Sequence, residues 1–265
     1  DNDLMYTDHT PGFGSAAKFI ATSVLETYLD SSVYINNGIF ILETMGRDTG
    51  WLASAAALAQ LNGKQVADFI YLPETAFDID KFLIDVKNKF EEQNQVYIVV
   101  SEGIRTAEGK FVAEAHAQAH DKFGHAQLGG VGNYLKNLII SSGITSRVKS
   151  LELGVLQRCA MHCASNIDIE EAYEVGYEAL RQASLGKCGY MIGIKRESNT
   201  PYKSSYFLIE ADKVANNVKY FPTEWINEEG NNLKAEVLEY LSPLVSSVPS
   251  VISSLPMPVF KVFNK

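Results

Sequence analysis

Short, continuously apolar runs recur along the first hundred residues and alternate with segments of helical spacing. The runs at 40–44, 68–72 and 96–101 predict buried strands, because a strand that is covered on both faces has no polar side. Segment 49–60 is rich in Ala and Leu, and segment 78–92 has apolar side chains three and four positions apart, at Ile79, Phe82, Leu83, Val86 and Phe90. This alternation predicts βαβ units, so we expect an α/β fold whose parallel sheet carries helices on both faces.

The pattern continues less regularly after residue 130. The elements that we predict there are helices at 132–142 and 168–185 and strands at 148–153 and 190–195. Asp168 is the predicted N-cap of the longer helix, with Glu171 three positions later as in a capping box. No flexible linker interrupts the chain, so we expect two lobes in contact: an α/β region at 1–145, and a second lobe with a C-terminal extension at 146–265.

Composition narrows the class of protein. The chain has 265 residues, of which 46% are apolar and 21% charged, and it carries a formal charge of −9. This acidic balance argues against a nucleic-acid-binding protein. No apolar run approaches the ~20 residues that cross a bilayer, so we expect no membrane span. Three cysteines and no visible signal sequence predict a reduced protein of the cytoplasm.

Two predicted strands end in chemically distinctive loops, and ligands collect beyond the carboxyl ends of parallel strands. Met45-Gly46-Arg47 follows the first strand. Its glycine allows the backbone to approach a ligand, and its arginine is a planar, permanently charged donor that suits phosphate. Glu102 follows the strand at 96–101, where a carboxylate can accept a hydrogen bond from a sugar hydroxyl. The alternatives are a strand–helix turn with an exposed arginine and an acidic helix cap.

Charged residues gather in two further segments. Asp1, Asp3 and Asp8 lie within eight residues, and close carboxylates suit Mg²⁺ coordination or proton abstraction from a hydroxyl. Three cations surround the predicted strand at 148–153 and suit an anion; they are Arg147, Lys149 and Arg158. The alternative for both segments is a solvated turn.

Two groups of histidines and cysteines resemble metal sites without completing one. The first is the pair His116 and His120, four positions apart on a predicted helix with Glu114 and His125 nearby, and no fourth ligand with helical spacing follows. The second comprises Cys159, His162 and Cys163, which have neither CxxC spacing nor a distant partner pair. We therefore predict no zinc site and reduced, structural thiols.

Four motifs, taken in their order along the chain, resemble the phosphofructokinase family. Asp1-Asn2-Asp3 matches the end of the family's Thr-Ile-Asp-Asn-Asp motif, and Met45-Gly46-Arg47 matches its Met-Gly-Arg loop. Ser101-Glu102-Gly103 is similar to the family's sugar-binding glutamate turn. Leu153-Gly154-Val155-Leu156-Gln157-Arg158 is similar to its second substrate loop.

The resemblance covers about residues 1–196, and segments 8–18 and 222–230 look closer to members that use pyrophosphate than to the short bacterial ATP enzymes. It implies a phosphofructokinase-like fold and the glycolytic transfer of a phosphoryl group to the C1 hydroxyl of fructose 6-phosphate, giving fructose 1,6-bisphosphate. Pyrophosphate is favoured over ATP as the donor. The resemblance also implies Mg²⁺ as the cofactor and a homodimer or homotetramer.

The resemblance implies a role for each matched residue. Asp1 would take the proton from the C1 hydroxyl, and Asp3 would help to hold Mg²⁺ and position the phosphoryl group. Arg47 would stabilise that group in transit, while Met45 and Gly46 pack against the sugar. The residues implied to bind the sugar and its 6-phosphate are Glu102, Lys149 and Arg158.

Three positions depart from the family's pattern. Short bacterial members carry His at Val155 and Arg at Gly38, and Lys149 stands at a usual Arg that reaches across a subunit interface. The family's Gly-rich donor-phosphate loop and its aspartate-bearing glycine turn precede the matched region and are not found in these 265 residues. We therefore expect this chain by itself to fold without transferring phosphoryl groups. The alternative function is a non-catalytic, sugar-phosphate-binding regulatory subunit of the same fold.

Overall fold

A four-stranded parallel sheet lies at the centre of the computed structural model, which describes residues 1–33, 38–113 and 130–245. Its strands stand in the order β4-β5-β1-β6. They are β1 (Ile39–Thr44), β4 (Phe69–Tyr71), β5 (Val96–Ser101) and β6 (Val148–Glu152). Every pair is parallel, so all four carboxyl ends meet at one edge. The strands predicted from apolar runs are confirmed.

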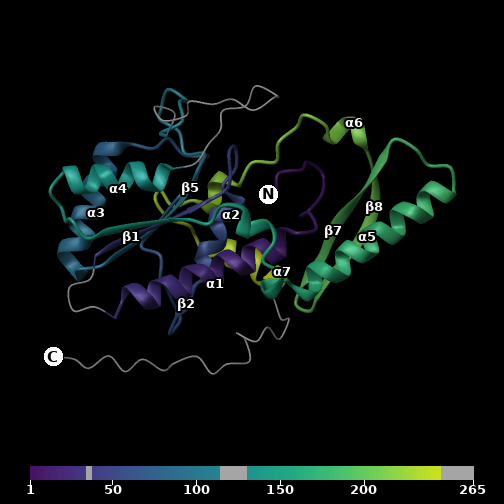
Figure 1. Ribbon diagram of the computed structural model, residues 1–265. Coiled ribbons are helices and arrows are strands. Elements are labelled where there is room, and N and C mark those ends of the chain that lie inside the picture. The colour runs from purple at the N-terminus through teal and green to yellow at the C-terminus, as the bar shows by residue number, and fades with distance from the viewer. Residues whose placement is uncertain (34–37, 114–129, 246–265) are drawn as a thin grey trace.

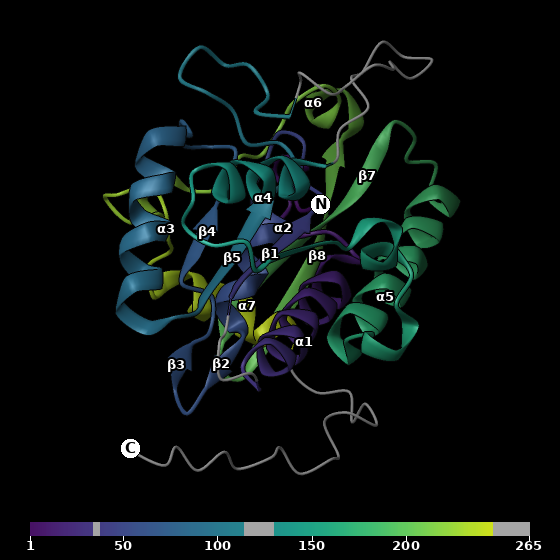
Figure 2. The ribbon, with the colours of Figure 1, turned by 60° about the vertical axis from the view of Figure 1, so that its left-hand side comes forward.

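Helices cover both faces of this sheet, as Figure 2 shows. Ile39 and Ile41 of β1 face a core that includes α3 (Ile79–Gln93) and α4 (Val131–Ser141). Phe40 and Leu42 face the opposite core. That core is covered by α1 (Phe13–Ser31), α2 (Trp51–Ser54) with the 3₁₀ turn η1 (Ala55–Leu58), and α7 (Glu236–Val245). The expected α/β class is therefore confirmed.

A hairpin and a long helix form a second body beside the sheet (Figure 1). β7 (Tyr190–Asn199) and β8 (Tyr202–Glu210) pair in antiparallel fashion, and α5 (Asn166–Ser184) packs on β7. β6 lies beyond the expected boundary at residue 145 but pairs with β1 of the central sheet. The division into 1–145 and 146–265 stays a prediction.

Short elements complete the described part of the chain. They are β2 (Gln60–Leu61), β3 (Lys64–Gln65), η3 (Gly154–Arg158), η4 (Met161–Cys163), α6 (Ala211–Val214) and η5 (Thr223–Trp225). Within the described residues, no helix is both long and apolar enough to cross a membrane.

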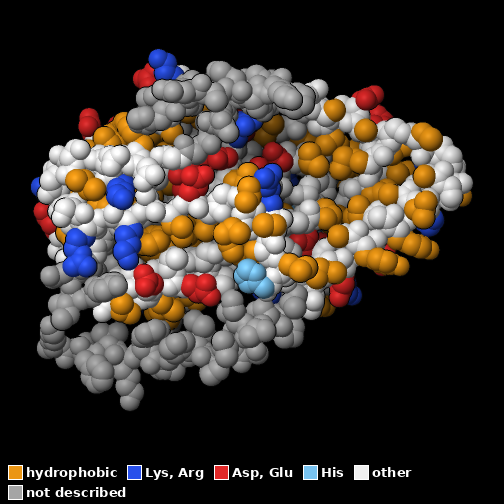
Figure 3. All heavy atoms as spheres, viewed as in Figure 1, with side chains coloured by type: hydrophobic (Ala, Val, Ile, Leu, Met, Phe, Trp, Pro, Cys, Tyr) orange, Lys and Arg blue, Asp and Glu red, His pale blue; other side chains and the backbone are white. Residues whose placement is uncertain are grey.

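Apolar side chains gather on the surface over α5 and the hairpin (Figure 3). The exposed apolar residues of these elements include Tyr173, Tyr177, Leu180 and Tyr190.

Local sequence rules explain where α3 begins and ends. Asp78 is extended and accepts a hydrogen bond from the Lys81 N–H at 3.0 Å, as an N-cap does. Asn94 ends the helix in the left-handed conformation, with φ of 56°. Phe82 and Val86 are fully buried on the face that the apolar spacing predicted.

The predicted start of the longer helix is wrong. α5 begins at Asn166 with Ser165 as the N-cap residue, so Asp168 lies inside the first turn. Asp168 and Glu171 are both buried and bind groups outside their own helix. The capping-box pattern was misleading because these two carboxylates are used by the segment that leads into α1. Helix α1 and strand β8 were not predicted at all.

Candidate active site

The loops predicted to carry chemistry meet at the carboxyl edge of the sheet. Thr44 at the end of β1 lies opposite Ser101 at the end of β5, and Glu43 lies opposite Glu152 of β6. Backbone hydrogen bonds continue past these strands, because Glu102 N–H donates to the Thr44 carbonyl at 2.9 Å. The first residues after three adjacent strands therefore lie side by side.

The Met45-Gly46-Arg47 loop is held from both neighbouring strands. Gly46 N–H donates to Glu102 Oε1 at 3.3 Å, and Ser101 Oγ donates to the Gly46 carbonyl at 2.6 Å. From the β6 side, Met45 N–H donates to Oε1 of the buried Gln157 at 3.2 Å. The loop is thus fixed in place by hydrogen bonds from both sides.

Two glycines are required for this close approach. Gly46 has φ of +140°, and a Cβ there would lie 2.6 Å from Ser101 Oγ. A Cβ at Gly103 would collide with the carbonyls of Arg47 and Gly46. Only glycine lets the two loops stack backbone on backbone, because any side chain would push them apart.

Glu102 and Arg47 are both half-buried and interact electrostatically. Burial raises the pKa of Glu102, while the Gly46 hydrogen bond and the Arg47 charge oppose that rise. The pair presents one cation and one carboxylate at the same edge. Such a pair can bind a phosphoryl group and a hydroxyl next to each other.

Asp1, Asp3 and Arg158 lie near one another at the second part of the site. Asp1 is exposed and Asp3 half-buried. The charges of Asp3 and Arg158 both act on the backbone nitrogen of residue 1, so both lie close to it. Arg158 lines a cavity of about 200 Å³ together with Gly12 and Ser15, at the start of α1. The structure therefore brings this predicted anion-binding residue to the aspartate segment.

A buried polar network that the sequence did not predict holds the aspartate segment. Lys219 is half-buried, and this desolvation lowers its pKa to about 8 against the raising charges of Asp8 and Asp3. Its ammonium group donates to Asn2 Oδ1 at 3.2 Å and to the Asp8 carbonyl at 2.6 Å. His9 lies between two carboxylates, with Nδ1 2.8 Å from Asp8 and Nε2 2.5 Å from Glu171.

Glu43 is a second buried group that sequence reasoning missed. It accepts hydrogen bonds from Gly130 N–H at 3.0 Å and Gly132 N–H at 2.8 Å, at the first turn of α4. Burial raises its pKa to about 7, these hydrogen bonds oppose the rise, and the charges of Glu152 and Glu102 add to it. An acidic residue inside a strand that is buried on both faces was the available signal.

The structure does not bring Lys149 to the other predicted residues. It is the second residue of β6, opposite Phe40, and pairs with Asp30 at 3.6 Å on the exposed surface. Three residues separate it from the carboxyl end of its strand, a distance of about 10 Å. The Arg that other family members carry at Gly38 is also blocked here, because a Cβ would collide with the Arg147 carbonyl.

Comparison with known proteins settles the family. The Phosphofructokinase family matches residues 1–183, which is well over half of the chain. The chain belongs to the phosphofructokinase family. The resemblance read from the four motifs is confirmed.

Three similar proteins, one curated relative and two solved structures, carry pyrophosphate in their names. The pyrophosphate–fructose 6-phosphate 1-phosphotransferase of Methylococcus capsulatus is 40% identical over 92% of this chain and 58% of its own length. The solved pyrophosphate-dependent phosphofructokinase of Nitrosospira multiformis is 33% identical, with a TM-score of 0.80 over 98% of this chain and 60% of its own. That of Marinobacter aquaeolei is 35% identical, with a TM-score of 0.79 over 93% of this chain and 58% of its own. The chain thus spans about three fifths of the length of these relatives.

The donor chemistry at the aspartate segment fits the Mg²⁺ of a phosphofructokinase. Mg²⁺ is usually held by one or two carboxylates together with substrate phosphates, and Asp3 offers a half-buried carboxylate beside Asp1. Among the described residues, no group of three or more His, Cys, Asp or Glu side chains could hold a metal by itself. Asp3 would therefore share the ion with phosphate oxygens.

The structure describes only one of the two histidine and cysteine groups. His116, His120 and their neighbours lie outside the described residues. Cys159 is an exposed free thiol and Cys163 a buried one. Reduced thiols were predicted, and the structure pairs neither with another cysteine.

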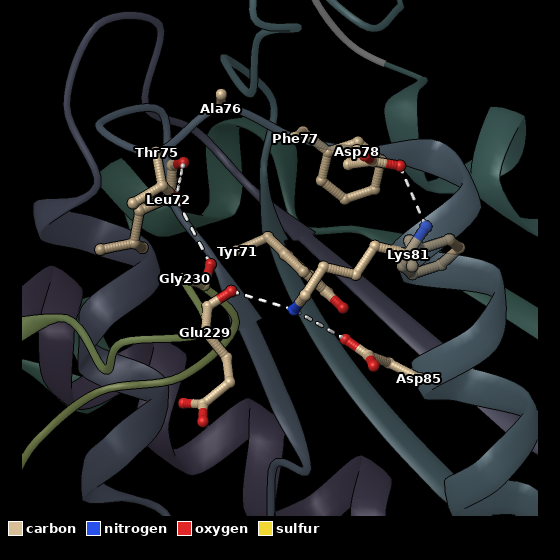
Figure 4. Close-up of a pocket in the computed structure, with 11 residues that line it drawn as sticks. Tyr71, Leu72, Thr75, Ala76, Phe77, Asp78, Lys81, Asp85, Glu229 and Gly230 are labelled. Atoms are coloured by element: carbon tan, nitrogen blue, oxygen red, sulfur yellow. Dashed lines mark hydrogen bonds and ion pairs between the residues drawn. The ribbon is translucent and has the colours of Figure 1, made fainter.

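A smaller cavity lies at the carboxyl end of β4 (Figure 4). The Lys81 ammonium crosses it, donating to Asp85 Oδ2 at 3.2 Å and to the Glu229 carbonyl at 3.0 Å. The buried hydroxyl of Tyr71 has no hydrogen-bond partner there. With about 30 Å³ of space it has room for one water rather than a sugar phosphate.

Proposed function

We propose that this chain forms the acceptor-substrate side of a pyrophosphate-dependent phosphofructokinase. The observation that carries the proposal is the meeting of the Arg47 loop and Glu102 at one sheet edge. Arg158 supports it, because its charge acts on residue 1 and it lines a cavity with Gly12 and Ser15. The relatives at 40% identity, which are named for pyrophosphate and fructose 6-phosphate, support the same reaction.

In this proposal the residues bind and orient the sugar phosphate. Glu102 accepts a hydrogen bond from a sugar hydroxyl, and Met45 and Gly46 pack against the ring. Arg158 binds the 6-phosphate, and Lys149 contributes a further cation from a neighbouring subunit of a homodimer or homotetramer. Binding energy spent on this orientation is what converts the transfer into an effectively unimolecular step.

The catalytic groups act on the C1 hydroxyl. Asp1 takes the hydroxyl proton as the C1 oxygen attacks the terminal phosphorus of pyrophosphate. The bridging P–O bond breaks, orthophosphate leaves, and Arg47 stabilises the charge on the phosphoryl group in transit. Asp3 would hold Mg²⁺, whose positive charge would offset the charge of the phosphates. Catalysis of this kind is chiefly positioning and electrostatic stabilisation, so fixed loops serve it well.

The donor is the finer part of the proposal. Pyrophosphate is favoured because the relatives at 40% identity carry it in their names, whereas an ATP-dependent 6-phosphofructokinase of Nostoc is 34% identical over 72% of this chain. The alternative, a non-catalytic subunit that binds the sugar phosphate, keeps Glu102 and Arg158 but has no use for a base at Asp1.

One pair of experiments tests the proposal. Calorimetry of this chain with fructose 6-phosphate should show binding that Glu102→Gln weakens. A coupled assay on the full-length gene product should then show turnover with pyrophosphate that exceeds turnover with ATP. Binding without turnover from either donor would support the regulatory subunit, and no binding at all would contradict both functions.

A further inference from the structure

Lys219 contacts the aspartate segment through its side chain and its backbone. Its ammonium group donates to Asn2 Oδ1 at 3.2 Å, to the Thr7 carbonyl at 3.1 Å and to the Asp8 carbonyl at 2.6 Å. Its backbone N–H donates to the Asp3 carbonyl at 2.8 Å. All three ammonium protons therefore form hydrogen bonds with residues 2–8, and the Lys219 backbone N–H holds the backbone of Asp3.

The same residue also contacts the helix that follows the arginine loop. Trp51 is the first residue of α2, four positions after Arg47. Its indole N–H donates to the Lys219 carbonyl at 2.9 Å, and the Lys219 ammonium lies 5.0 Å from the centre of the Trp51 ring. Lys219 thus contacts both the aspartate segment and the helix that directly follows the arginine loop.

Burial makes this arrangement more than a surface contact. Asn2 is fully buried and Trp51 nearly so, and Asn2 Nδ2 also donates to the Tyr240 hydroxyl at 2.9 Å. An isolated β-bridge between Leu4 and Val218 continues the contact along the backbone. A buried acceptor that loses its donor costs free energy, so residues 2–8 have a single preferred position while Lys219 is present.

We infer that Lys219 is a positioning residue, which sets where Asp1 and Asp3 lie relative to the Met45-Gly46-Arg47 loop. It touches no substrate, because its donors are occupied by the protein. Its effect on phosphoryl transfer is indirect: the base and the proposed metal-binding carboxylate stay aligned with the arginine. Misplacement of such groups by about 1 Å can lower turnover by about 100-fold.

Lys219→Met tests the inference, because methionine keeps an unbranched apolar stem and removes the donors. Hydrogen–deuterium exchange on this chain should show faster exchange at residues 2–9 in the variant. In the full-length gene product kcat should fall by about 10- to 100-fold, with KM for fructose 6-phosphate changed by less than about twofold. Lys219→Gln, which keeps two N–H donors, should recover part of the lost kcat.

Lys234→Met is the matched control. Lys234 also donates to a backbone carbonyl, that of Glu224 at 2.8 Å, but on the exposed surface. It should leave exchange at residues 2–9 and kcat unchanged. A folded Lys219→Met variant with the kcat of the wild type would overturn the inference. If that variant does not fold, Asn2→Ala removes one acceptor of the same ammonium, and an unchanged kcat would overturn it equally.

The inference about turnover rests on the proposed function, and the two fail differently. No turnover by the wild type counts against the proposed function. Turnover by the wild type that Lys219→Met leaves intact counts against Lys219. The exchange measurement needs no catalysis, so unchanged exchange at residues 2–9 contradicts the positioning role whatever the reaction is.

Discussion

The carboxylate of Asp168 caps helix α1, although Asp168 lies 153 positions after Ser15 in the sequence. Its two oxygens accept hydrogen bonds from Gly12 N–H at 2.5 Å and from Ser15 N–H at 3.0 Å. The Ser15 hydroxyl donates to the same carboxylate and accepts from Ser165 N–H at 3.0 Å. The first turn of α5 therefore satisfies the orphan donors at the start of α1, next to the cavity that Arg158 lines.

Removing this cap should destabilise the whole fold. Asp168→Ala leaves the Gly12 and Ser15 donors without their partner, so we expect the free energy of unfolding to fall by about 1–3 kcal/mol. Urea denaturation with circular dichroism measures this. Glu170→Ala, two positions away on the exposed side of α5, is the control and should change it by less than about 0.5 kcal/mol. Equal effects of the two substitutions would contradict the capping role.

The His9 cluster should make stability depend on pH. Burial lowers the pKa of His9, but hydrogen bonds and charges from Asp8 and Glu171 outweigh it and raise the pKa above the usual 6.5. Burial alone would raise the pKa values of Asp8 and Glu171, but their contacts with His9 outweigh burial and lower both pKa values. Arg196 adds to this lowering at Asp8, and Tyr202 adds to it at Glu171.

The stabilisation by His9 is therefore present below pH 6.5 and is lost as the pH rises through the raised pKa. The stabilisation by the carboxylates of Asp8 and Glu171 is present above their usual pKa values of 3.8 and 4.5. It is lost as the pH falls through their lowered pKa values. We expect His9→Gln to cost about 1–3 kcal/mol near pH 5.5 and less near pH 9.5. His162→Gln, on an exposed imidazole, is the control for the urea titrations. A cost that grows toward alkaline pH would refute this.

Asp1→Asn in the full-length gene product should lower kcat by about 10²–10⁴ with little change in KM for fructose 6-phosphate. The reason is that an amide cannot accept the C1 hydroxyl proton but still fits the space. Steady-state kinetics in the coupled assay measures both constants. Asp212→Asn, on the exposed surface of α6, should behave as the wild type. Near-normal turnover by Asp1→Asn would remove Asp1 from the base role.

Arg47→Ala should lower kcat by about 10²–10³ while KM for fructose 6-phosphate stays within a few-fold, because Arg47 meets charge that develops in the transition state. Arg181→Ala, whose guanidinium pairs with Glu178 on the surface of α5, is the control. A rise in KM with unchanged kcat would make Arg47 an anchor for the bound sugar phosphate instead.

The histidine and cysteine groups should bind no zinc. Elemental analysis of protein purified without added metal should find far less than one zinc per chain. The measurement also covers His116 and His120, which lie outside the described residues. One tightly held zinc per chain would show that a ligand set was overlooked.

The sequence by itself determined the central sheet and the chemistry of its loops. β5 and α3 are specified locally, since the six residues of β5 are all buried and Asp78 caps the helix three positions from its donor. The Met45-Gly46-Arg47 loop follows a strand directly, so its place at the carboxyl edge follows from the parallel topology. Hydrophobic period and turn chemistry act between near neighbours, which is why a sequence displays them.

The tertiary structure alone decided how the polar residues are paired. Asp168 caps a distant helix rather than its own, Glu171 binds His9 162 positions away, and Lys219 binds Asn2 217 positions away. Lys149 has the predicted charge, yet its place near the amino end of β6 keeps it from the other site residues of its own chain. A buried polar group needs a hydrogen-bond partner, and that partner is the group that the packed elements bring within about 3 Å of it. Because this group can come from anywhere in the chain, no local sequence pattern predicts it.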